Sequence, residues 1–437
     1  MLKTFFGGVH PKSKKEATEH KPIKKVPMAA RLKVPMIQHI GAPCEPTVFV
    51  GDTVKKGQLI GKSDAFISAY IHAPTSGKVV EITEKEHPVL GMCESVVIES
   101  DGKNQWVDGL PKNRDWQEMS VKEIIQAVRE AGVVGLGGAA FPSHVKLSPP
   151  PDRKIVALVV NAAECEPYLT ADHRSMLDCT DEFITGTKIA MKALGVEKCY
   201  IGIEVNKSDA IQLLQEKLTG SEIEVVQLAC KYPQGGEKSL IYAISGQEIP
   251  SGGLPADIGY VVHNVGTLIA IKRAVVEGIP LIERVVTISG SCILNPQNLV
   301  LPIGITFEDA IELCGGFMQN ASRVIMGAPM MGIAQRTLKA PVIKGTSGIT
   351  TLSHEEVELN KEGNCIRCGS CVRACPMGLE PHMLSRLIQM SMYEQAKTDY
   401  NLLDCIECGS CVYVCPAKRH IVQNIKTAKM QVSAKKK

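Results

Sequence analysis

Eight cysteines near the carboxyl end of the chain occur in two copies of one spacing. Each copy reads Cys-x-x-Cys-x-x-Cys-x-x-x-Cys-Pro, over residues 365–376 and 405–416. Three thiolates on one tight loop can bind three corners of an iron–sulfur cubane, and the fourth, set apart by the proline-terminated turn, reaches the other cluster. Zinc sites, the alternative, would use paired Cys-x-x-Cys sequences separated by a long gap. The spacing therefore indicates iron–sulfur chemistry.

The two motifs predict two [4Fe-4S] clusters with crossed ligand sets. One set is Cys365, Cys368, Cys371 and Cys415, and the other is Cys405, Cys408, Cys411 and Cys375. Clusters of this type carry electrons, so we expect the chain to transfer electrons. The other eight cysteines show no ligand spacing and are expected to be buried free thiols. They are residues 44, 93, 165, 179, 199, 230, 292 and 314.

Three further segments could hold a phosphate or a nucleotide. Residues 135–140 have the spacing G-x-G-x-x-A, but this loop follows a predicted helix, so it is not a standard dinucleotide fingerprint. Residues 161–167, Asn-Ala-Ala-Glu-Cys-Glu-Pro, follow a predicted strand. Residues 232–238 also follow a strand and open a helix, which is a natural phosphate cradle. Each segment alone is more typical of a plain turn than of a binding site.

The elements around these segments alternate between strands and helices. We expect a helix over 121–131, begun by a capping box at Ser120 and Glu123 and ended by Gly132. Strands are predicted at 155–160, 199–205 and 223–228, and helices at 181–194 and at 208–218, the latter capped by Ser208. This order predicts an open parallel α/β sheet, with its ligand outside the carboxyl ends of the strands.

The flanking regions predict a multidomain chain. Residues 1–35 are expected to be an extended basic arm and 426–437 a basic tail. Residues 36–110 show short strands at 47–52, 58–61 and 77–82, typical of a small β barrel or sandwich. This unit resembles biotinyl/lipoyl carrier barrels, but it has Asp64 to Ile67 where carriers have a modifiable lysine, so a structural role is expected.

The remaining domains follow in order along the chain. The α/β domain is expected to span 115–280. A small α+β unit follows at 281–350, with strands at 285–288 and 323–326 and a helix at 307–314 capped by Thr306. The cluster domain is 355–425, with a helix between the motifs near 383–392.

Composition excludes several classes of protein. Aromatic residues make up 4% and the net charge is +3, so neither base stacking nor a basic field favours nucleic acid as a partner. The lysines of residues 12–25 and 435–437 are expected to lie on solvated, mobile termini, with contact to an acidic partner or an anionic membrane as the alternative. No run approaches the ~18 apolar residues of a membrane span, and no secretory signal opens the chain. We expect a cytoplasmic chain that meets a membrane only as a peripheral subunit.

Several segments together resemble a known family. Residues 6–11 (Phe-Gly-Gly-Val-His-Pro), 137–142, 161–168 and 252–259, with the double cysteine motif, look like the RnfC family, a component of the Rnf complex, which is an ion-translocating ferredoxin:NAD oxidoreductase. A more distant resemblance is to the NADH-binding flavoprotein subunit of respiratory complex I. The resemblance covers nearly the whole chain in the family's domain order, and it implies that the 281–350 unit is the β-grasp domain called SLBB.

The resemblance also implies cofactors and their ligands. FMN, bound non-covalently, would be lined by Gly135, Gly137, Gly138, Lys146, Asn161, Glu164, Gly235, Glu237 and Asn264. The substrate NAD(H) would face Phe141 and Glu166. No residue is assigned a catalytic role. The chain departs from the complex I pattern at Leu136, Ala163 and Gly236, where Arg, Asp and Glu are usual, so fewer polar groups would hold the flavin.

The function implied is that of an NAD-dependent oxidoreductase subunit, peripheral on the cytoplasmic face of the cell membrane. It would exchange electrons between NAD(H), FMN and two [4Fe-4S] clusters within an ion-pumping complex. Its partners would be the other subunits of that complex and, indirectly, ferredoxin. Two alternatives remain open. One is a soluble flavin and iron–sulfur reductase such as a metabolosome cobalamin reductase, and the other is a flavin-free electron conduit.

Overall fold

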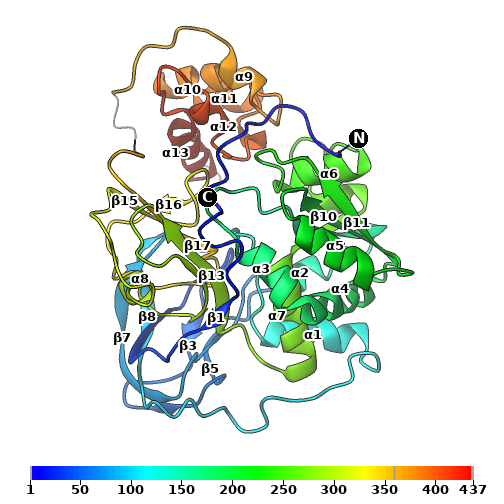
Figure 1. Ribbon diagram of the computed structural model, residues 1–437, viewed down its shortest axis with the longest axis vertical. Coiled ribbons are helices and arrows are strands. Elements are labelled where there is room, and N and C mark those ends of the chain that lie inside the picture. Colours follow the sequence, from blue (N-terminus) through cyan, green and yellow to red (C-terminus); the bar gives the residue numbers. More distant parts are fainter. Residues whose placement is uncertain (1, 358–360, 435–437) are drawn as a thin grey trace.

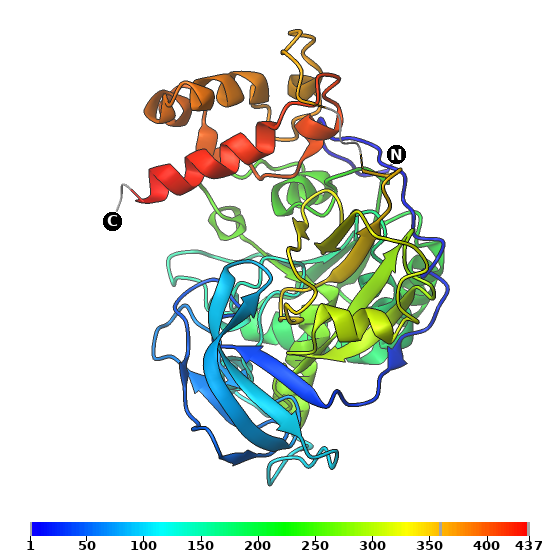
Figure 2. The same cartoon turned by 90° about the vertical axis from the view of Figure 1, so that its left-hand side faces the viewer.

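The computed structural model describes residues 2–357 and 361–434. It contains four folded units joined by an N-terminal strap, which we define as residues 2–25 (Figure 1). The units follow one another in sequence as a β barrel, a central α/β domain, a β-grasp unit and a helical cluster domain. The cluster domain lies at one end of the molecule and the barrel at the other (Figure 2).

The barrel unit, residues 31–100, is built from two small antiparallel sheets. One has the order β2-β8-β7-β4 and the other β3-β5-β6. The strands are β2 (Arg31–Pro35), β3 (Glu45–Pro46), β4 (Thr53–Val54), β5 (Leu59–Lys62), β6 (Ile71–His72), β7 (Gly77–His87) and β8 (Gly91–Ser100). The predicted strand at 47–52 is wrong. Reciprocal bonds between Phe49 and Asp52 close a turn there, because Gly51 has a positive φ of 101° that reverses the chain.

The central domain, residues 121–277, has a four-stranded parallel sheet in the order β11-β10-β9-β12. Its strands are β9 (Ala157–Ala162), β10 (Lys198–Glu204), β11 (Ile223–Leu228) and β12 (Tyr260–Asn264). The chain leaves β9 towards β10 and β11 and later returns to add β12 on the opposite side of β9. Strand order therefore reverses between β9 and β12, which makes this crevice the switch point of the sheet.

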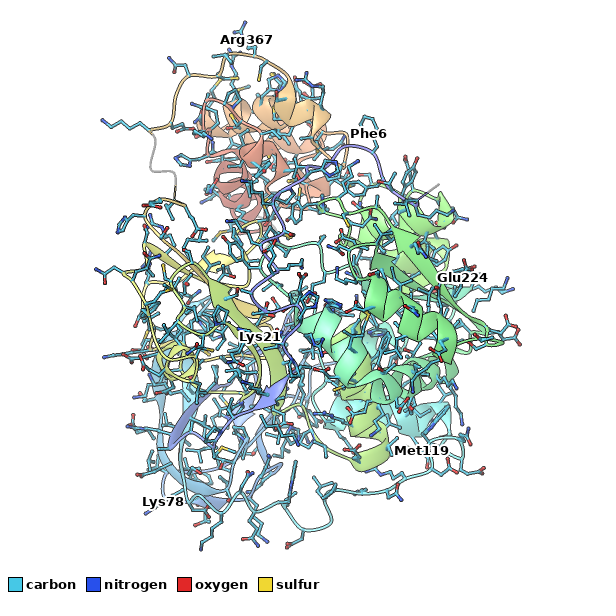
Figure 3. All side chains as sticks on the ribbon, in the orientation of Figure 1. Phe6, Lys21, Lys78, Met119, Glu224 and Arg367 are labelled. Atoms are coloured by element: carbon cyan, nitrogen blue, oxygen red, sulfur yellow. The ribbon has the colours of Figure 1, made fainter. Side chains whose placement is uncertain are left out.

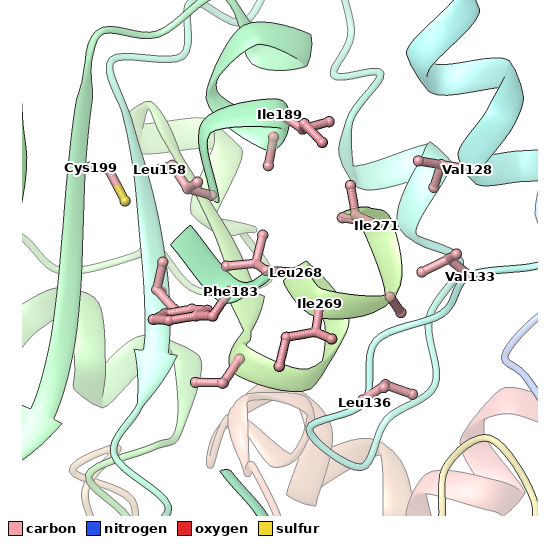
Figure 4. Close-up of a cluster of buried hydrophobic side chains, with 14 of the residues drawn as sticks. Val128, Val133, Leu136, Leu158, Phe183, Ile189, Cys199, Leu268, Ile269 and Ile271 are labelled. Atoms are coloured by element: carbon pink, nitrogen blue, oxygen red, sulfur yellow. The ribbon is translucent and has the colours of Figure 1, made fainter. Parts of the chain in front are cut away.

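Helices cover both faces of this sheet. They are α1 (Val121–Glu130), α2 (Ser143–Lys146), α3 (Ala171–Asp178), α4 (Thr180–Leu194), α5 (Ser208–Lys217), α6 (Glu237–Ser245), α7 (Val265–Lys272), the 3-10 turn η1 (Pro255–Ile258) and the π turn η2 (Arg273–Glu277). Leu158, Phe183 and Leu268 join one core on the face covered by α4 and α7 (Figure 4). Val159 and Leu240 belong to a second core under α6.

The predicted α/β elements are confirmed within one or two residues. The capping box at Ser120 and Glu123 is present, and Gly195 ends α4 in the left-handed conformation. The cap predicted for α5 is wrong, because Lys207 is the N-cap and Ser208 is the first helical residue. The Lys207 side chain is also buried, and its ammonium donates a hydrogen bond to the carbonyl of Ala163 in the loop after β9.

The β-grasp unit, residues 283–352, contributes most of a six-stranded sheet in the order β1-β14-β13-β17-β15-β16. Its elements are β13 (Glu283–Gly290), β14 (Gln297–Pro302), α8 (Phe307–Glu312), β15 (Arg323–Met326), β16 (Ile333–Ala334) and β17 (Gly348–Leu352). Thr306 caps α8 as predicted, by accepting the amide of Asp309. The outermost strand, β1 (Lys24–Lys25), belongs to the strap and pairs with β14.

The cluster domain, residues 361–434, is helical. Its elements are α9 (Ser370–Arg373), α10 (Pro381–Gln389), α11 (Tyr393–Thr398), η3 (Leu402–Asp404), α12 (Ser410–Tyr413) and α13 (Ile421–Ala434). Helix α10 is the one predicted between the motifs, and it ends earlier than expected because Ser391 has a positive φ of 59°. Among the described helices, none is long and apolar enough to cross a membrane.

The expected solvation of the N-terminal lysines is confirmed for Lys12, Lys14, Lys21, Lys24 and Lys25, which are exposed, and is wrong for Lys15, which is buried. The segment is anchored, because Thr18 is also buried and Lys24–Lys25 form β1. The strap begins beside the central sheet, passes along the cluster domain and reaches the β-grasp sheet (Figures 1 and 2). The described part of the predicted basic tail, 426–434, is helical as the end of α13, and residues 435–437 lie outside the described residues.

Candidate cofactor sites

Four cysteine thiols surround one cavity in the cluster domain. The cavity measures about 20 Å³ and is lined by Cys375, Cys405, Cys408 and Cys411 together with apolar side chains such as Leu384. Burial raises the pKa of Cys405 to about 11 and raises that of Cys411 as well, and the neighbouring thiols of the set add to both shifts. Four buried thiols can bind as thiolates only if a cation compensates them, as irons of a cluster would.

The arrangement of these thiols fits a polynuclear cluster. Over residues 2–357 and 361–434, no three His, Cys, Asp or Glu side chains are gathered so as to hold a single metal ion. A cubane needs wider spacing, because each of its ligands binds a different iron. The structure thus brings Cys375, from the first motif, to the three leading cysteines of the second motif.

The other predicted ligand set lies at the outer end of the cluster domain. Cys365 and Cys368 are exposed, Cys371 is buried and Cys415 is partly buried. Burial raises the pKa of the Cys371 thiol, and the nearby Cys415 adds a smaller contribution to this shift. The loop that carries Cys365 and Cys368 also carries Arg367, which marks the tip of the molecule (Figure 3).

Two asparagines mark the switch point of the central sheet. Asn161 near the end of β9 and Asn264 at the end of β12 are register partners. Asn161 donates to the carbonyl of Gly235 at 2.7 Å, which ties β9 to the loop before α6. Asn264 caps α7 by accepting the amide of Gly266 at 2.9 Å. A Cβ on Gly137 would lie 3.4 Å from the Cβ of Asn264, so the glycine loop rests on this asparagine.

The glycine loop leaves room for a ligand. It is closed by the amide of Gly135, which donates to the carbonyl of Phe141 at 2.8 Å. Gly138 has a φ of 115°, and a Cβ built on it would meet no atom within 4 Å. Leu136, where the complex I pattern has Arg, packs in the core of the domain (Figure 4). Its amide donates to the Thr267 hydroxyl at 2.8 Å, so this departure anchors the loop from within.

Lys146 and Glu237, both predicted to line the flavin, form an ion pair. The Lys146 ammonium, at the end of α2, lies 2.5 Å from a carboxylate oxygen of Glu237 and donates to the carbonyl of Val262 at 3.1 Å. Both side chains are partly exposed, so an anionic ligand could compete for the ammonium. Gly236, the departure beside Glu237, is the N-cap of α6, and a Cβ there would approach Ile406 of the cluster domain within 3.6 Å.

Glu164 faces the protein interior. Its carboxylate accepts the amides of Asp172 at 2.7 Å and of His173 at 3.3 Å, which satisfies the first turn of α3. Two lysines that sequence reasoning missed hold the same loop. Lys15 donates to the carbonyl of Glu164 at 2.8 Å, and Lys207 donates to that of Ala163 at 2.6 Å. Both ammoniums are almost fully buried. Lys15 is 149 residues from its acceptor, so no local signal could have revealed it.

Glu166 lies where the central domain, the β-grasp unit and the cluster domain meet. Its carboxylate accepts the amides of Met330 at 3.3 Å and Met331 at 3.0 Å, and burial raises its pKa to about 7. The neighbouring Tyr232 is buried and donates its hydroxyl to the carbonyl of Cys408 at 2.7 Å. Phe141, predicted to share the nucleotide with Glu166, lies half-buried on the glycine loop. The bonds of Glu166 are directed to the β-grasp unit and away from that loop.

The switch point of the sheet and the four-thiol cavity are connected by a short series of contacts. Gly235, which Asn161 bonds, donates its own amide to the Cys165 thiol at 3.2 Å. Cys165 packs against a small core that contains Tyr232 and Cys408. The edge of the sheet at Asn161 thus connects through Gly235, Cys165 and Tyr232 to Cys408 of the four-thiol cavity.

Comparison with known proteins matches every unit of the chain. Family models match as the RnfC barrel sandwich hybrid domain over residues 3–103, the Nuo51 FMN-binding domain over 128–273, the SLBB domain over 285–334 and the 4Fe-4S dicluster domain over 358–416. The predicted multidomain fold class, with its barrel, Rossmann-like flavin domain, SLBB unit and helical two-cluster domain, is confirmed.

Curated relatives match along nearly the whole chain. One from Clostridium ljungdahlii, part of a proton-translocating ferredoxin:NAD(+) oxidoreductase complex, is 57% identical over 99% of this chain and 94% of its own length. The counterpart from the Na(+)-translocating complex of Acetobacterium woodii is 46% identical over 99% and 98%. A third, from an ion-translocating oxidoreductase complex of Rhodobacter capsulatus, is 42% identical over 89% and 76%.

A solved structure shares the fold. The NAD+-reducing [NiFe]-hydrogenase in the H2-reduced state aligns with a TM-score of 0.50 at 18% identity, covering 75% of this chain. The chain spans 64% of that hydrogenase chain, so the likeness concerns the fold alone.

Proposed function

The chain belongs to the RnfC family of ion-translocating ferredoxin:NAD(+) oxidoreductase (Rnf) complexes, and from this premise we propose how its residues carry electrons. It is an oxidoreductase subunit that transfers electrons, with FMN and [4Fe-4S] clusters as cofactors and NAD as substrate. The family assignment leaves no support for the alternative of a metabolosome cobalamin reductase. FMN, when bound, exchanges an electron pair with NAD(H) and single electrons with a cluster.

The proposed flavin site is the switch point between β9 and β12. Asn161, Asn264 and the glycine loop form its walls, and the open space at Gly138 admits the ligand. Lys146 supplies a positive charge at the rim of this site. On flavin binding, its ammonium would leave the ion pair with Glu237 and pair with an anionic group of the flavin. Glu164 supports the site indirectly, since its carboxylate orients α3 and its loop. Phe141 is proposed to face the nucleotide, and Glu166 to stand on the side of the clusters.

The observation that carries this proposal is the short packed path from the sheet edge to the four-thiol cavity. Asn161, Gly235 and Cys165 are joined by hydrogen bonds, and Cys165 packs with Tyr232 and Cys408. The cluster on Cys375, Cys405, Cys408 and Cys411 is thus proposed to exchange electrons with the flavin. The cluster on Cys365, Cys368, Cys371 and Cys415 would face the outside, where an electron partner can approach.

We further propose that the chain is held on the cytoplasmic face of the cell membrane by other subunits of such a complex, with ferredoxin reached indirectly. The absence of a membrane-crossing helix among the described residues and the names of its relatives support this placement.

Stopped-flow spectroscopy tests the flavin site. Anaerobically reconstituted chain should bind FMN, and NADH should bleach the flavin band. Lys146→Ala should weaken FMN binding about tenfold to a hundredfold, because a charge-assisted contact contributes roughly 1.5–3 kcal/mol. Lys154→Ala, at an exposed lysine of the same domain, is the matched control and should bind like wild type. A wild type that binds no flavin, or whose flavin stays oxidised under excess NADH, would mean that the chain is an electron conduit only.

A further inference from the structure

The segment Phe6-Gly7-Gly8-Val9-His10-Pro11 has no role in either cofactor site, yet it is inserted between the two domains that carry them. Figure 3 places Phe6 at the junction of the cluster domain and the central domain. On the central side, Val9 and Tyr232 exchange a reciprocal pair of backbone bonds at 2.8 and 2.9 Å. On the cluster side, the amide of Gly8 donates to the carbonyl of Ala374 at 2.9 Å. One short peptide therefore bonds both domains.

The two glycines act as a spacer of minimal thickness. Gly7 has a φ of 72°, and a Cβ built on it would lie 2.6 Å from the carbonyl oxygen of Cys375. Gly8 has a φ of 79°, and a Cβ there would lie 2.7 Å from the carbonyl oxygen of Tyr232. Both distances are shorter than any real Cβ contact, and backbone atoms cannot move aside as a flexible side chain can. Any side chain at either position would separate the domains.

The residues touched by this spacer belong to the electron path. Cys375 is the crossed ligand of the four-thiol cavity, and Tyr232 also donates its hydroxyl to Cys408 of the same cavity. The strap is anchored on either side of the spacer. Phe5 is buried beneath the Lys231 ammonium, which lies 4.7 Å from its ring centre and donates to its carbonyl at 2.8 Å. Lys15 is buried beneath Glu164.

We propose that Gly7 and Gly8 are positioning residues that set the separation between the flavin and the cluster on Cys375, Cys405, Cys408 and Cys411. No bond is made or broken at these glycines and no proton rests on them. With both cofactors bound, NADH would supply an electron pair to the flavin, and the flavin would pass the two electrons on singly, one for each of the two clusters. The proposal rests on the proposed function, because it presumes a flavin at the sheet edge.

The test compares Gly7→Ala and Gly8→Ala with Gly102→Ala in the full, anaerobically reconstituted chain. Gly102 is the matched control, because it has a φ of 71° and a Cβ there would meet no atom within 4 Å. It reproduces the backbone strain without the clash. Phe5→Leu is a further variant, which loosens the strap without backbone strain if the alanine variants fold poorly.

A set of measurements on each variant separates positioning from assembly. Iron and flavin contents, and cluster reduction by dithionite, should match wild type. Bleaching of the flavin by NADH should also be unchanged. The subsequent reduction of the clusters should slow about tenfold to a hundredfold, since a misplacement of about 1 Å can cost roughly two orders of magnitude in rate. Amide exchange measured by mass spectrometry over residues 2–12 and 226–236 should accelerate in the Gly7 and Gly8 variants and not in Gly102→Ala.

Two results would overturn the proposal. Cluster reduction at the wild-type rate despite faster amide exchange would show that the strap does not set the separation. Loss of iron in Gly7→Ala would show that the strap serves cluster assembly instead. Failure of the proposed function looks different, because NADH would then leave the flavin of wild type oxidised while the exchange pattern would still distinguish the variants.

Discussion

Cys375 belongs to the first cysteine motif in the sequence and to the second motif in space. Its crossed position could be predicted because the motif is local, with every spacing fixed within about ten residues and a proline that ends the turn. Glu166 could not be placed in the same way. Its partners Met330 and Met331 lie in another unit of the chain, and no pattern around residue 166 indicates them.

Replacement of Cys375 by serine tests the crossed ligand set. We expect the cluster on Cys405, Cys408 and Cys411 to be lost or altered in EPR spectra, with iron falling from about eight to about four per chain if that cluster is lost. Cys93→Ser removes a thiol of the barrel and should leave both signals intact. Alteration confined to the cluster on Cys365, Cys368 and Cys371 would contradict the crossed set.

Glu166 should make stability fall as pH rises. Burial raises its pKa from 4.5 to about 7, so the folded chain holds this proton more tightly than the unfolded chain does. The resulting stabilisation is complete below pH 4.5 and is lost as pH rises to about 7, by roughly 3 kcal/mol. Glu166→Gln cannot ionise and should remove this dependence.

The thermal unfolding midpoint, measured at about pH 5.5 and about pH 8, checks this expectation. Relative to wild type, Glu166→Gln should be more stable at the higher pH than at the lower one. The exposed Glu222→Gln should follow wild type at both. Equal pH dependence in Glu166→Gln and wild type would mean that Glu166 is ionised throughout.

At the scale of elements, sequence patterns located most of the central domain because its signals are local. The strand 223–228 and the helix ended by Gly195 agree with the structure. The turn at Gly51 interrupted a predicted strand, since alternation alone does not reveal a positive φ. Helix α3 was not predicted, because its first turn is satisfied by Glu164, a residue outside the helix.

Helices α4 and α7 pack so closely that Gly186 is required between them. A Cβ on Gly186 would lie 1.9 Å from the carbonyl oxygen of Leu268. Helix propensity favours alanine by about 0.5–1 kcal/mol, but overpacking costs about 1–3 kcal/mol, so the steric effect should win. Gly186→Ala is expected to lower the unfolding midpoint, followed by circular dichroism. The exposed Lys188→Ala on the same helix should change it little. A stabilised Gly186→Ala would show that α4 and α7 can separate at low cost.

At the scale of the whole molecule, the order of the units was predicted and their assembly was not. Each unit has its own composition and periodicity, whereas the strap joins them through contacts with residues that are far away in the sequence. Lys3 forms an isolated parallel β-bridge with Leu228 of the central sheet. The Lys21 ammonium donates to the carbonyl of Pro296 in the β-grasp unit. Such contacts leave no pattern in the residues themselves.

Association with the membrane should depend on charge. We expect contacts to partner subunits to hold the chain in place, because its relatives are subunits of ion-translocating complexes. Contacts between exposed charges are screened within about 8–10 Å near physiological salt, so washing membranes with high salt or a chaotrope should release the chain. Immunoblots of supernatant and pellet measure the release. Extraction by detergent alone would point to insertion or a lipid anchor.

The strap also imposes an order on biosynthesis. Gly8 bonds to Ala374, which the ribosome adds 366 residues later. At about 5–20 residues per second, Gly8 waits roughly 20 to 70 s for this partner. Val9 can meet Tyr232 earlier, once the central domain has been made. The bond between Gly8 and Ala374 is thus among the last contacts of the strap to form, and it can form only after synthesis of the cluster domain has begun.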